Sequence, residues 1–223
     1  MESSSMNDTY CQSEPATHSS VKPSHRLRKW LSDEEYIAAQ DKSSSWSHKS
    51  PWGEAAAKKF VQFGEALGDN LCHDDTVADF GGNDGYAANC FYLAHKIKPL
   101  VVDCEPTRLK YASAVYRLPV LEAFIENMNE LANNSIDWGF SSHTLEHMRE
   151  PERALREMAR VVKRACYFVV PLEEKSHGKD NIAHAIFFTK TDEWKNLLIG
   201  NGWKVIKADN IGAHEAHLFC EPA

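Results

Sequence analysis

The sequence predicts an α/β fold with a mostly parallel sheet, helices on both of its faces and an antiparallel hairpin at the C-terminus. Three observations predict it. From residue 51 onward, short apolar runs alternate with helix-length amphipathic segments, which is the order of βαβ units. A glycine-rich turn follows the first of the apolar runs. The run at 165–170 is apolar without a break, as expected for a central strand that is buried on both faces.

The individual elements follow from periodicity, prolines and glycines. Predicted helices carry apolar residues at three- and four-residue spacing or open at a proline, and they span 54–67, 86–97, 106–117, 151–163 and 194–199. Predicted strands are short apolar runs at 76–80, 100–102, 119–125, 136–141 and 165–170. The runs at 203–208 and 217–220 are expected to pair as the terminal hairpin.

The first 50 residues differ in composition from the rest of the chain. They hold 13 of the 18 serines and no glycine. Residues 1–24 contain almost nothing that could be buried, so we expect a disordered tail there. Residues 25–50 are expected to form an N-terminal helical extension of the main domain at 51–223, with a helix that begins near Ser32. Its apolar side chains are expected to pack against the main domain: Trp30, Leu31, Tyr36 and Ile37.

Charge and cysteine content argue against several classes of protein. The formal net charge is −7, which does not favour a nucleic-acid-binding protein. The six cysteines form no CxxC pair, so they are expected to be reduced thiols and neither a disulfide framework nor a zinc site. We find no signal peptide and no apolar run long enough for a membrane span, so we expect no membrane partner and a cytoplasmic location.

The most informative stretch is 79–85, Asp-Phe-Gly-Gly-Asn-Asp-Gly, between a predicted strand and a predicted helix. A glycine turn of this kind brings backbone N–H groups and a helix N-terminus close to a ligand. Asp103 ends the next predicted strand, 22 residues after Gly81. An acidic side chain at that distance is placed to hold the ribose hydroxyls of a nucleotide, and Glu105 is the alternative if the strand ends two residues later.

These motifs resemble the class I S-adenosylmethionine-dependent methyltransferases. The first motif of that family is an acidic residue followed by G-x-G-x-G. Here Asp79, Gly81 and Gly85 match it, and Asn83, which tolerates positive φ, stands at the middle glycine. Later segments resemble the fourth strand, the helix before strand five and the helix before the terminal hairpin: 134–147, 151–163 and 187–203. The resemblance spans about residues 75–208 and is greatest to the type 11 group, which acts on small molecules.

The resemblance implies a Rossmann-like, seven-stranded domain with S-adenosylmethionine as cofactor. By that resemblance Asp79 and Gly81 contact the methionine moiety and Asp103 the ribose, while Ser141 to His143 line the sulfonium side. Residues after the third strand would flank the adenine. The cofactor residues expected in total are Asp79, Gly81, Gly82, Asn83, Gly85, Asp103, Glu126, Asn127, Met128 and Ser141.

Methyl transfer is an in-line displacement, so the protein mainly has to align the acceptor. A general base is needed only if the acceptor carries a proton, and the candidates are His143, His177 and His184. Residues 143–147 also fit the metalloprotease pattern H-x-x-E-H. That chemistry requires the motif within a helix and a further carboxylate, whereas His143 ends a predicted strand. We therefore expect no metal.

The acceptor class is narrowed by what the sequence does not contain. It has neither the N-P-P-Y type of sequence at the end of strand four nor a Pro-Cys nucleophile, which favours a small molecule, a sugar or a peptide group over nucleic acid. Three alternatives stay open: an aminopropyl transferase, a nicotinamide oxidoreductase and a catalytically silent binding protein with this cofactor fold. The first would need an acidic residue near Ser141, and the second a G-x-G-x-x-G turn. A homo-oligomer also stays open.

Overall fold

The structure, a computed structural model, describes residues 32–43, 46–172, 184–211 and 214–223. The predicted tail at 1–24, the apolar residues Trp30 and Leu31, and the candidate base His177 lie outside the described residues.

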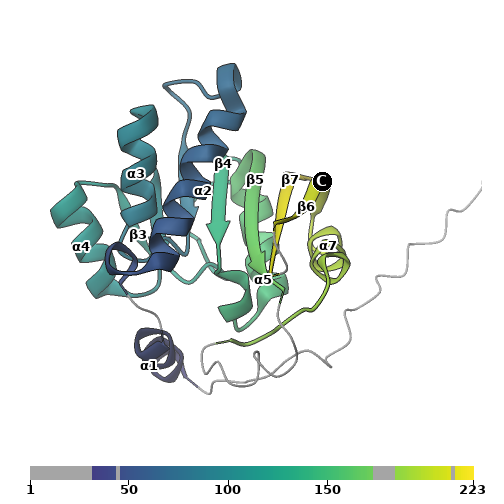
Figure 1. The fold of residues 1–223 in the computed structure, drawn as a ribbon. Coiled ribbons are helices and arrows are strands. Elements are labelled where there is room, and N and C mark those ends of the chain that lie inside the picture. The colour runs from purple at the N-terminus through teal and green to yellow at the C-terminus, as the bar shows by residue number, and fades with distance from the viewer. Residues whose placement is uncertain (1–31, 44–45, 173–183, 212–213) are drawn as a thin grey trace, which may run out of the picture.

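The described residues form a seven-stranded sheet in the order β3-β2-β1-β4-β5-β7-β6 (Figure 1). The strands are β1 (Val77–Phe80), β2 (Leu100–Asp103), β3 (Val120–Glu122), β4 (Ile136–Ser142), β5 (Val162–Pro171), β6 (Trp203–Ile211) and β7 (Glu215–Pro222). Strands β1 to β5 pair in parallel, and β7 lies antiparallel between β5 and β6. Successive strands are added on one side of β1 up to β3 and on its other side from β4 onward, and ligands of open α/β sheets bind at such a topological switch point.

Two layers of helices enclose the sheet. The helices are α1 (Asp33–Ser43), α2 (Pro51–Leu67), α3 (Tyr86–His95), α4 (Pro106–Tyr116), α5 (Pro151–Val161) and α7 (Thr191–Ile199), with short 3₁₀ turns η2 (Ser47–Lys49), η3 (Gly68–Asn70) and η4 (Leu145–His147). Figure 1 shows α2 and α3 on one face of the sheet and α5 on the other, while α1 lies beyond the carboxyl ends of the strands.

Alternate residues of the central strands point into two separate cores. Ala78 and Phe80 of β1 pack with α5 and α7, whereas Val77 packs with α2 and α3. The second core contains a stack of Phe60 on Phe140, with 4.2 Å between ring centroids. A sheet whose two faces are both apolar has to be covered by helices on both sides, which explains the continuous apolar run of β5.

The predicted α/β fold with a seven-stranded, mostly parallel sheet is confirmed, with local corrections. Helix α2 begins at Pro51, earlier than predicted, because the Ser50 hydroxyl accepts a hydrogen bond from the Gly53 amide as an N-cap. Strand β3 is shorter than predicted, since its residues pair only from Val120 to Glu122. The predicted helix start in the N-terminal extension is present, and Ser32 accepts a hydrogen bond from the Glu35 amide.

No helix within the described ranges has the length and apolarity that a membrane crossing requires. The five cysteines in those ranges are free thiols, as predicted: Cys72, Cys90, Cys104, Cys166 and Cys220.

Candidate functional site

A pocket of about 670 Å³, part of it open to solvent, lies at the carboxyl ends of the parallel strands. Its walls come from four places: the glycine-rich turn after β1, the ends of β2 and β3, the segment after β4, and α1. The lining residues include Gly81, Asn83, Asp103 and Glu126, four of the predicted cofactor residues, together with His143. Elements far apart in sequence therefore meet around one cavity at the switch point of the sheet.

The turn after β1 holds its shape through positive φ angles and close packing. Gly81 has φ +76° and Asn83 has φ +53°. A Cβ atom on Gly81 would lie 2.4 Å from the Thr144 side chain, and one on Gly82 would lie 2.9 Å from the carboxylate of Asp79. Glycine is therefore required at 81 for both backbone conformation and space, and at 82 for space. Gly85, φ +75°, ends the turn and precedes α3.

Asp103 is held at the end of β2 by two backbone amides. Its Oδ2 accepts a hydrogen bond from Asn83 (2.9 Å) and its Oδ1 one from Glu105 (3.0 Å). Burial raises the pKa of Asp103, and these two hydrogen bonds oppose that shift. Glu105, the alternative carboxylate, is instead the N-cap of α4 and accepts from the amides of Thr107 and Arg108. Both residues line the pocket, but the Glu105 carboxylate is engaged in capping α4, whereas each oxygen of Asp103 accepts one backbone amide and keeps a lone pair.

Asp79 lies beneath the glycine turn and does not line the pocket wall. Its side chain is buried, and its Oδ2 has no hydrogen-bond partner among the described residues. Burial, followed by the nearby charges of Asp103 and Asp84, raises the pKa of Asp79 to about 8. A buried carboxyl group without a partner is unfavourable unless it is neutral or meets a cation.

Asp84 is a further buried carboxylate of the turn, which the sequence motif does not single out. Its Oδ2 accepts hydrogen bonds from the His48 ring (2.7 Å) and from the His48 amide (3.2 Å). The His48 ring in turn stacks on Tyr111 of α4, with 4.7 Å between centroids. The N-terminal extension is thus joined to the ligand-binding turn through η2, and no local sequence signal reveals this contact between positions 36 residues apart.

The segment after β3 reaches the pocket one to four residues after the strand ends. Glu126 lines the wall, its Oε1 accepts a hydrogen bond from the Arg149 amide, and its Oε2 has no partner within the described part of the chain. Asn127 is exposed and does not line the pocket. Met128 is fully buried in the hydrophobic core, so its side chain cannot flank a pocket ligand. Of the three residues predicted to flank the adenine, only Glu126 therefore lines the pocket, and because β3 ends at Glu122 this part of the wall is formed by Ala123–Glu126.

Helix α1 covers one side of the pocket through Tyr36, which is buried. The guanidinium of Arg149 lies 4.8 Å from the Tyr36 ring centroid and 4.7 Å from that of Phe124, and it also pairs with Asp33 at the start of α1. Arg149 therefore clamps the extension to the segment that follows β3.

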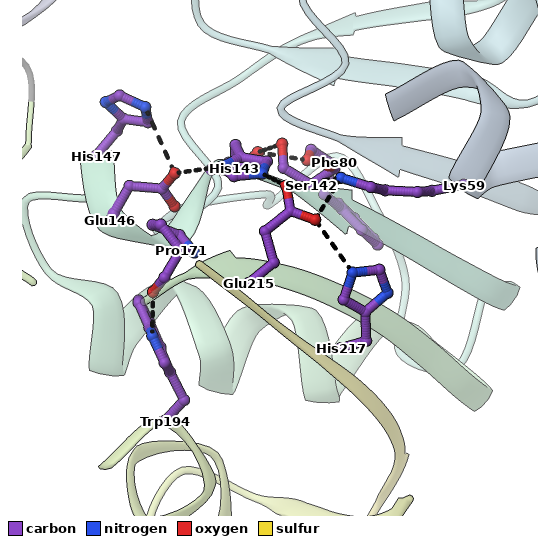
Figure 2. Close-up of polar contacts among 11 residues, drawn as sticks. Lys59, Phe80, Ser142, His143, Glu146, His147, Pro171, Trp194, Glu215 and His217 are labelled. Carbon is purple, nitrogen blue, oxygen red and sulfur yellow. Dashed lines mark hydrogen bonds and ion pairs between the residues drawn. The ribbon is translucent and has the colours of Figure 1, made fainter. Parts of the chain in front are cut away.

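A polar network occupies the carboxyl ends of β4, β5 and the start of β7 (Figure 2). Nε2 of His143 lies 2.9 Å from Oε1 of Glu215, and Nδ1 of His143 lies 3.4 Å from Oε1 of Glu146. Lys59 of α2 contacts both oxygens of Glu215, and His217 lies 3.2 Å from Oε2. Burial lowers the pKa of His143, but the two carboxylates outweigh it and raise the pKa to about 9. The hydrogen bond from His143, and then Lys59, hold the pKa of Glu215 well below its usual range.

The other residues predicted on this side have different surroundings. Ser141 is buried at the end of β4, and its hydroxyl has no partner among the described residues and does not line the pocket. His184 is buried next to His147, with 4.7 Å between ring centroids. The structure thus brings His143 to the pocket wall and His184 to the neighbouring η4 turn.

The chain can be compared with known proteins on this basis. Residues 78–170 match the type 11 family of methyltransferase domains. No curated protein matches the chain in sequence. Among solved structures, a chain of the complex between the Haloferax volcanii Trm112 methyltransferase activator and its methyltransferase aligns with a TM-score of 0.64 at 17% identity, covering 85% of this chain and 98% of that one.

Two further structures share the fold at similar distance. Magnesium protoporphyrin IX methyltransferase from Synechocystis, solved with bound S-adenosylmethionine, aligns with a TM-score of 0.57 at 13% identity, covering 77% of this chain and 80% of that one. The [4+2]-cyclase SpnF aligns with a TM-score of 0.60 at 13% identity, covering 73% and 81%. The family match at residues 78–170, which contain the glycine-rich turn and the ends of β1, β2 and β4, together with these folds supports a class I methyltransferase domain of type 11 that uses S-adenosylmethionine.

Proposed function

We propose that this chain transfers a methyl group from S-adenosylmethionine to a small-molecule acceptor, with the donor held in the pocket at the carboxyl ends of β1, β2 and β3. The observation that carries the proposal is the Asp103 carboxylate. It faces the same cavity as the glycine turn, and each of its oxygens already accepts one backbone N–H. The second lone pairs of the two oxygens can accept the two hydroxyl groups of a ribose.

The other donor contacts follow from groups in the pocket wall and directly beneath it. Glu126 has an unpartnered buried oxygen and would accept a hydrogen bond from the adenine amino group. The backbone of Gly81 to Asn83 would approach the methionine end, where a side chain at Gly81 would meet Thr144. The carboxyl group of Asp79 under this turn would become charged beside the cationic donor, because a cation offsets the cost of burying the carboxylate. These groups fit a ligand with a diol, an amino group and positive charge.

S-adenosylmethionine supplies a sulfonium-bound methyl group that needs no further activation. The protein's contribution is alignment, which is worth up to about 7–11 kcal/mol for well-oriented reactants. His143 at the end of β4 faces the cavity, and its ring is fixed between Glu146 and Glu215. A fixed ring on this wall would orient the acceptor relative to the methyl group. Tyr36 of α1 would close the opposite side and exclude water.

Calorimetry tests the donor assignment. S-adenosylhomocysteine should bind at micromolar concentration, roughly 8 kcal/mol of binding free energy, and NAD should not bind. Asp103→Ala should weaken binding by about 1.5–3 kcal/mol, the cost of losing charge-assisted hydrogen bonds. Asp137→Ala is the matched control, because Asp137 also accepts a backbone amide, from Thr76, but at the amino end of β4. Equal losses in both variants would contradict the ribose assignment.

The acceptor class needs a separate measurement. Purified protein with S-adenosylmethionine should form S-adenosylhomocysteine when mixed with fractionated small molecules from cells, as detected by mass spectrometry. Protein and nucleic-acid fractions serve as the comparison. Product formation confined to either of those fractions would refute the small-molecule part of the proposal while leaving the donor assignment intact.

A further inference from the structure

A cluster of metal-ligand side chains lies beside the pocket wall, on residues that the donor site does not use. Glu146 and His147 belong to η4, and His184 begins the segment described after β5. One ligand atom from each of the three lies within 4.8 Å of the other two. His147 also lines the pocket, so the cluster borders the space in which an acceptor would lie.

The Glu146 carboxylate is the most deeply buried group of this cluster. The side chain is 1% exposed, and neither oxygen accepts a hydrogen bond among the described residues. The nearest cationic groups are Nδ1 of His143, at 3.4 Å from Oε1, and Nε2 of His147, at 3.8 Å (Figure 2). Burying a carboxylate is costly, and these two contacts are longer than a metal–ligand bond, so a bound cation would offset the cost more directly.

The backbone holds the third residue of the cluster in place. The amides of Ala185 (2.7 Å) and Ile186 (3.2 Å) both donate hydrogen bonds to the main-chain oxygen of Glu146. Because His184 immediately precedes this double contact, the backbone holds it close to η4, and its ring lies 4.7 Å from that of His147, centroid to centroid. The three side chains thus come from two segments that are distant in sequence and joined by backbone hydrogen bonds, so no local sequence motif contains all of them.

We propose that Glu146, His147 and His184 bind one divalent transition-metal ion, with open coordination positions toward the pocket. Two imidazoles and one carboxylate are a ligand set for Zn²⁺ and for related ions such as Co²⁺. Ligand atoms on a tetrahedral ion with bonds of about 2.1 Å lie about 3.4 Å apart, so side-chain rotations must draw the three atoms closer than in the metal-free structure. The proposed site differs from the H-x-x-E-H pattern of the sequence, since His143 is replaced by the distant His184.

The position of the ion suggests the acceptor class, and this part rests on the proposed function. An ion with two open positions would bind an acceptor that carries two neighbouring oxygens. Coordination lowers the pKa of a bound hydroxyl group, so its proton leaves to solvent near neutral pH. The resulting oxyanion forms the new C–O bond as the C–S bond of the donor breaks, giving the methyl ether, neutral S-adenosylhomocysteine and one proton.

The test uses the full-length, tag-free chain after chelation and buffer exchange, titrated with Co²⁺ and followed by visible absorption and elemental analysis. We expect one Co²⁺ per chain. Its affinity should fall at least about 100-fold in Glu146→Gln and in His184→Ala, which is more than the 10–100-fold loss typical when a residue that only hydrogen-bonds to a metal ligand is changed. His73→Ala is the control, since that side chain is 84% exposed and lies outside the cluster. Affinity equal in all variants, or far less than one ion per chain, would overturn the proposal.

Two further measurements separate the metal site from the donor site and test the acceptor class. S-adenosylhomocysteine binding by His184→Ala should match that of the parent chain, which shows that the variant is folded and that the donor site is separate. If the parent chain binds Co²⁺ but not S-adenosylhomocysteine, the metal site stands and the proposed function fails. Adding catechol should change the Co²⁺ spectrum, whereas phenol, with one oxygen, should not, and an unchanged spectrum with catechol would overturn the acceptor assignment.

Discussion

Replacing Asp79 with asparagine tests how the buried carboxyl group under the glycine turn couples stability to pH. In the unliganded protein, burial and then the charges of Asp103 and Asp84 raise the pKa of Asp79 to about 8, against an ordinary value of 3.8. Asparagine has the same shape as the neutral acid and cannot ionise. The Asp79→Asn variant therefore keeps the packing and removes only this titration.

The sign of the effect follows from proton counting. Between the ordinary pKa and the raised one, the folded state holds a proton on Asp79 that the unfolded chain does not. Stability from this group is therefore full below about pH 4 and is lost as the pH rises through about 8. Each pH unit inside this window is worth up to 1.36 kcal/mol, so the parent chain should lose about 2–3 kcal/mol relative to Asp79→Asn between pH 5 and 7.

Urea unfolding of both proteins at half-unit pH steps measures this difference directly, because titrations at other sites are common to the two. Calorimetry of S-adenosylhomocysteine binding in two buffers of different ionisation enthalpy adds a second readout. The parent chain should release close to one proton near pH 7 on binding the ammonium-bearing ligand, and the variant should release fewer. Parallel stability curves for the two proteins would refute the reasoning, since they would show that Asp79 is ionised in the free protein.

Three other changes have definite expected outcomes. Arg149→Ala removes the clamp on α1 and should weaken donor binding by about 3- to 30-fold, on the scale of a partly buried cation–π contact, with faster amide exchange confined to α1. Gly81→Ala should lower the melting temperature strongly. Adding Thr144→Ala should restore part of the loss, because it removes the side-chain atoms that lie 2.4 Å from the new Cβ. If nothing is restored, the destabilisation comes from the positive φ angle alone. Deleting residues 1–24 should leave the melting temperature nearly unchanged, and a large drop would show that this segment packs into the fold.

The fold could be predicted because its signals are local. Prolines and N-caps mark helix starts, and central strands are continuous apolar runs, so the predicted elements agree with the structure within a few residues. The deviation that matters for the site is β3, where 119–125 contains only three paired residues. The sequence of this segment does not show where strand pairing stops. Pairing stops at Glu122 because its partner strand β2 ends at Asp103, and no signal within 119–125 marks that point. That uncertainty shifted the adenine prediction onto Met128, which is in the core.

The candidate site could be predicted only where one turn carries several of its residues. Three pocket residues could be predicted in this way: Gly81 and Asn83 in the turn after β1, and Asp103 at the end of β2. Because β1 and β2 are neighbours in a sheet of this order, their carboxyl ends lie side by side. His48 and Arg149 were missed because their roles depend on contacts across 36 residues in one case and 116 in the other. Such contacts are set by tertiary packing, for which a single sequence contains no periodic signal.

The segment that matches the family model and the rest of the chain contribute different parts of the site. The segment that matches the family, 78–170, contains the turn, Asp103 and Glu126, which together form the proposed donor half of the site. Outside this segment lie Tyr36 on α1, which lines the pocket, and two groups behind the wall: His184, next to His147, and the Lys59–Glu215 pair that fixes His143. If the donor is common to the family while acceptors differ, selectivity has to reside in parts that the family match does not include. Exchanging α1 or the η4-facing segment should therefore change the acceptor while leaving Asp103-dependent donor binding in place.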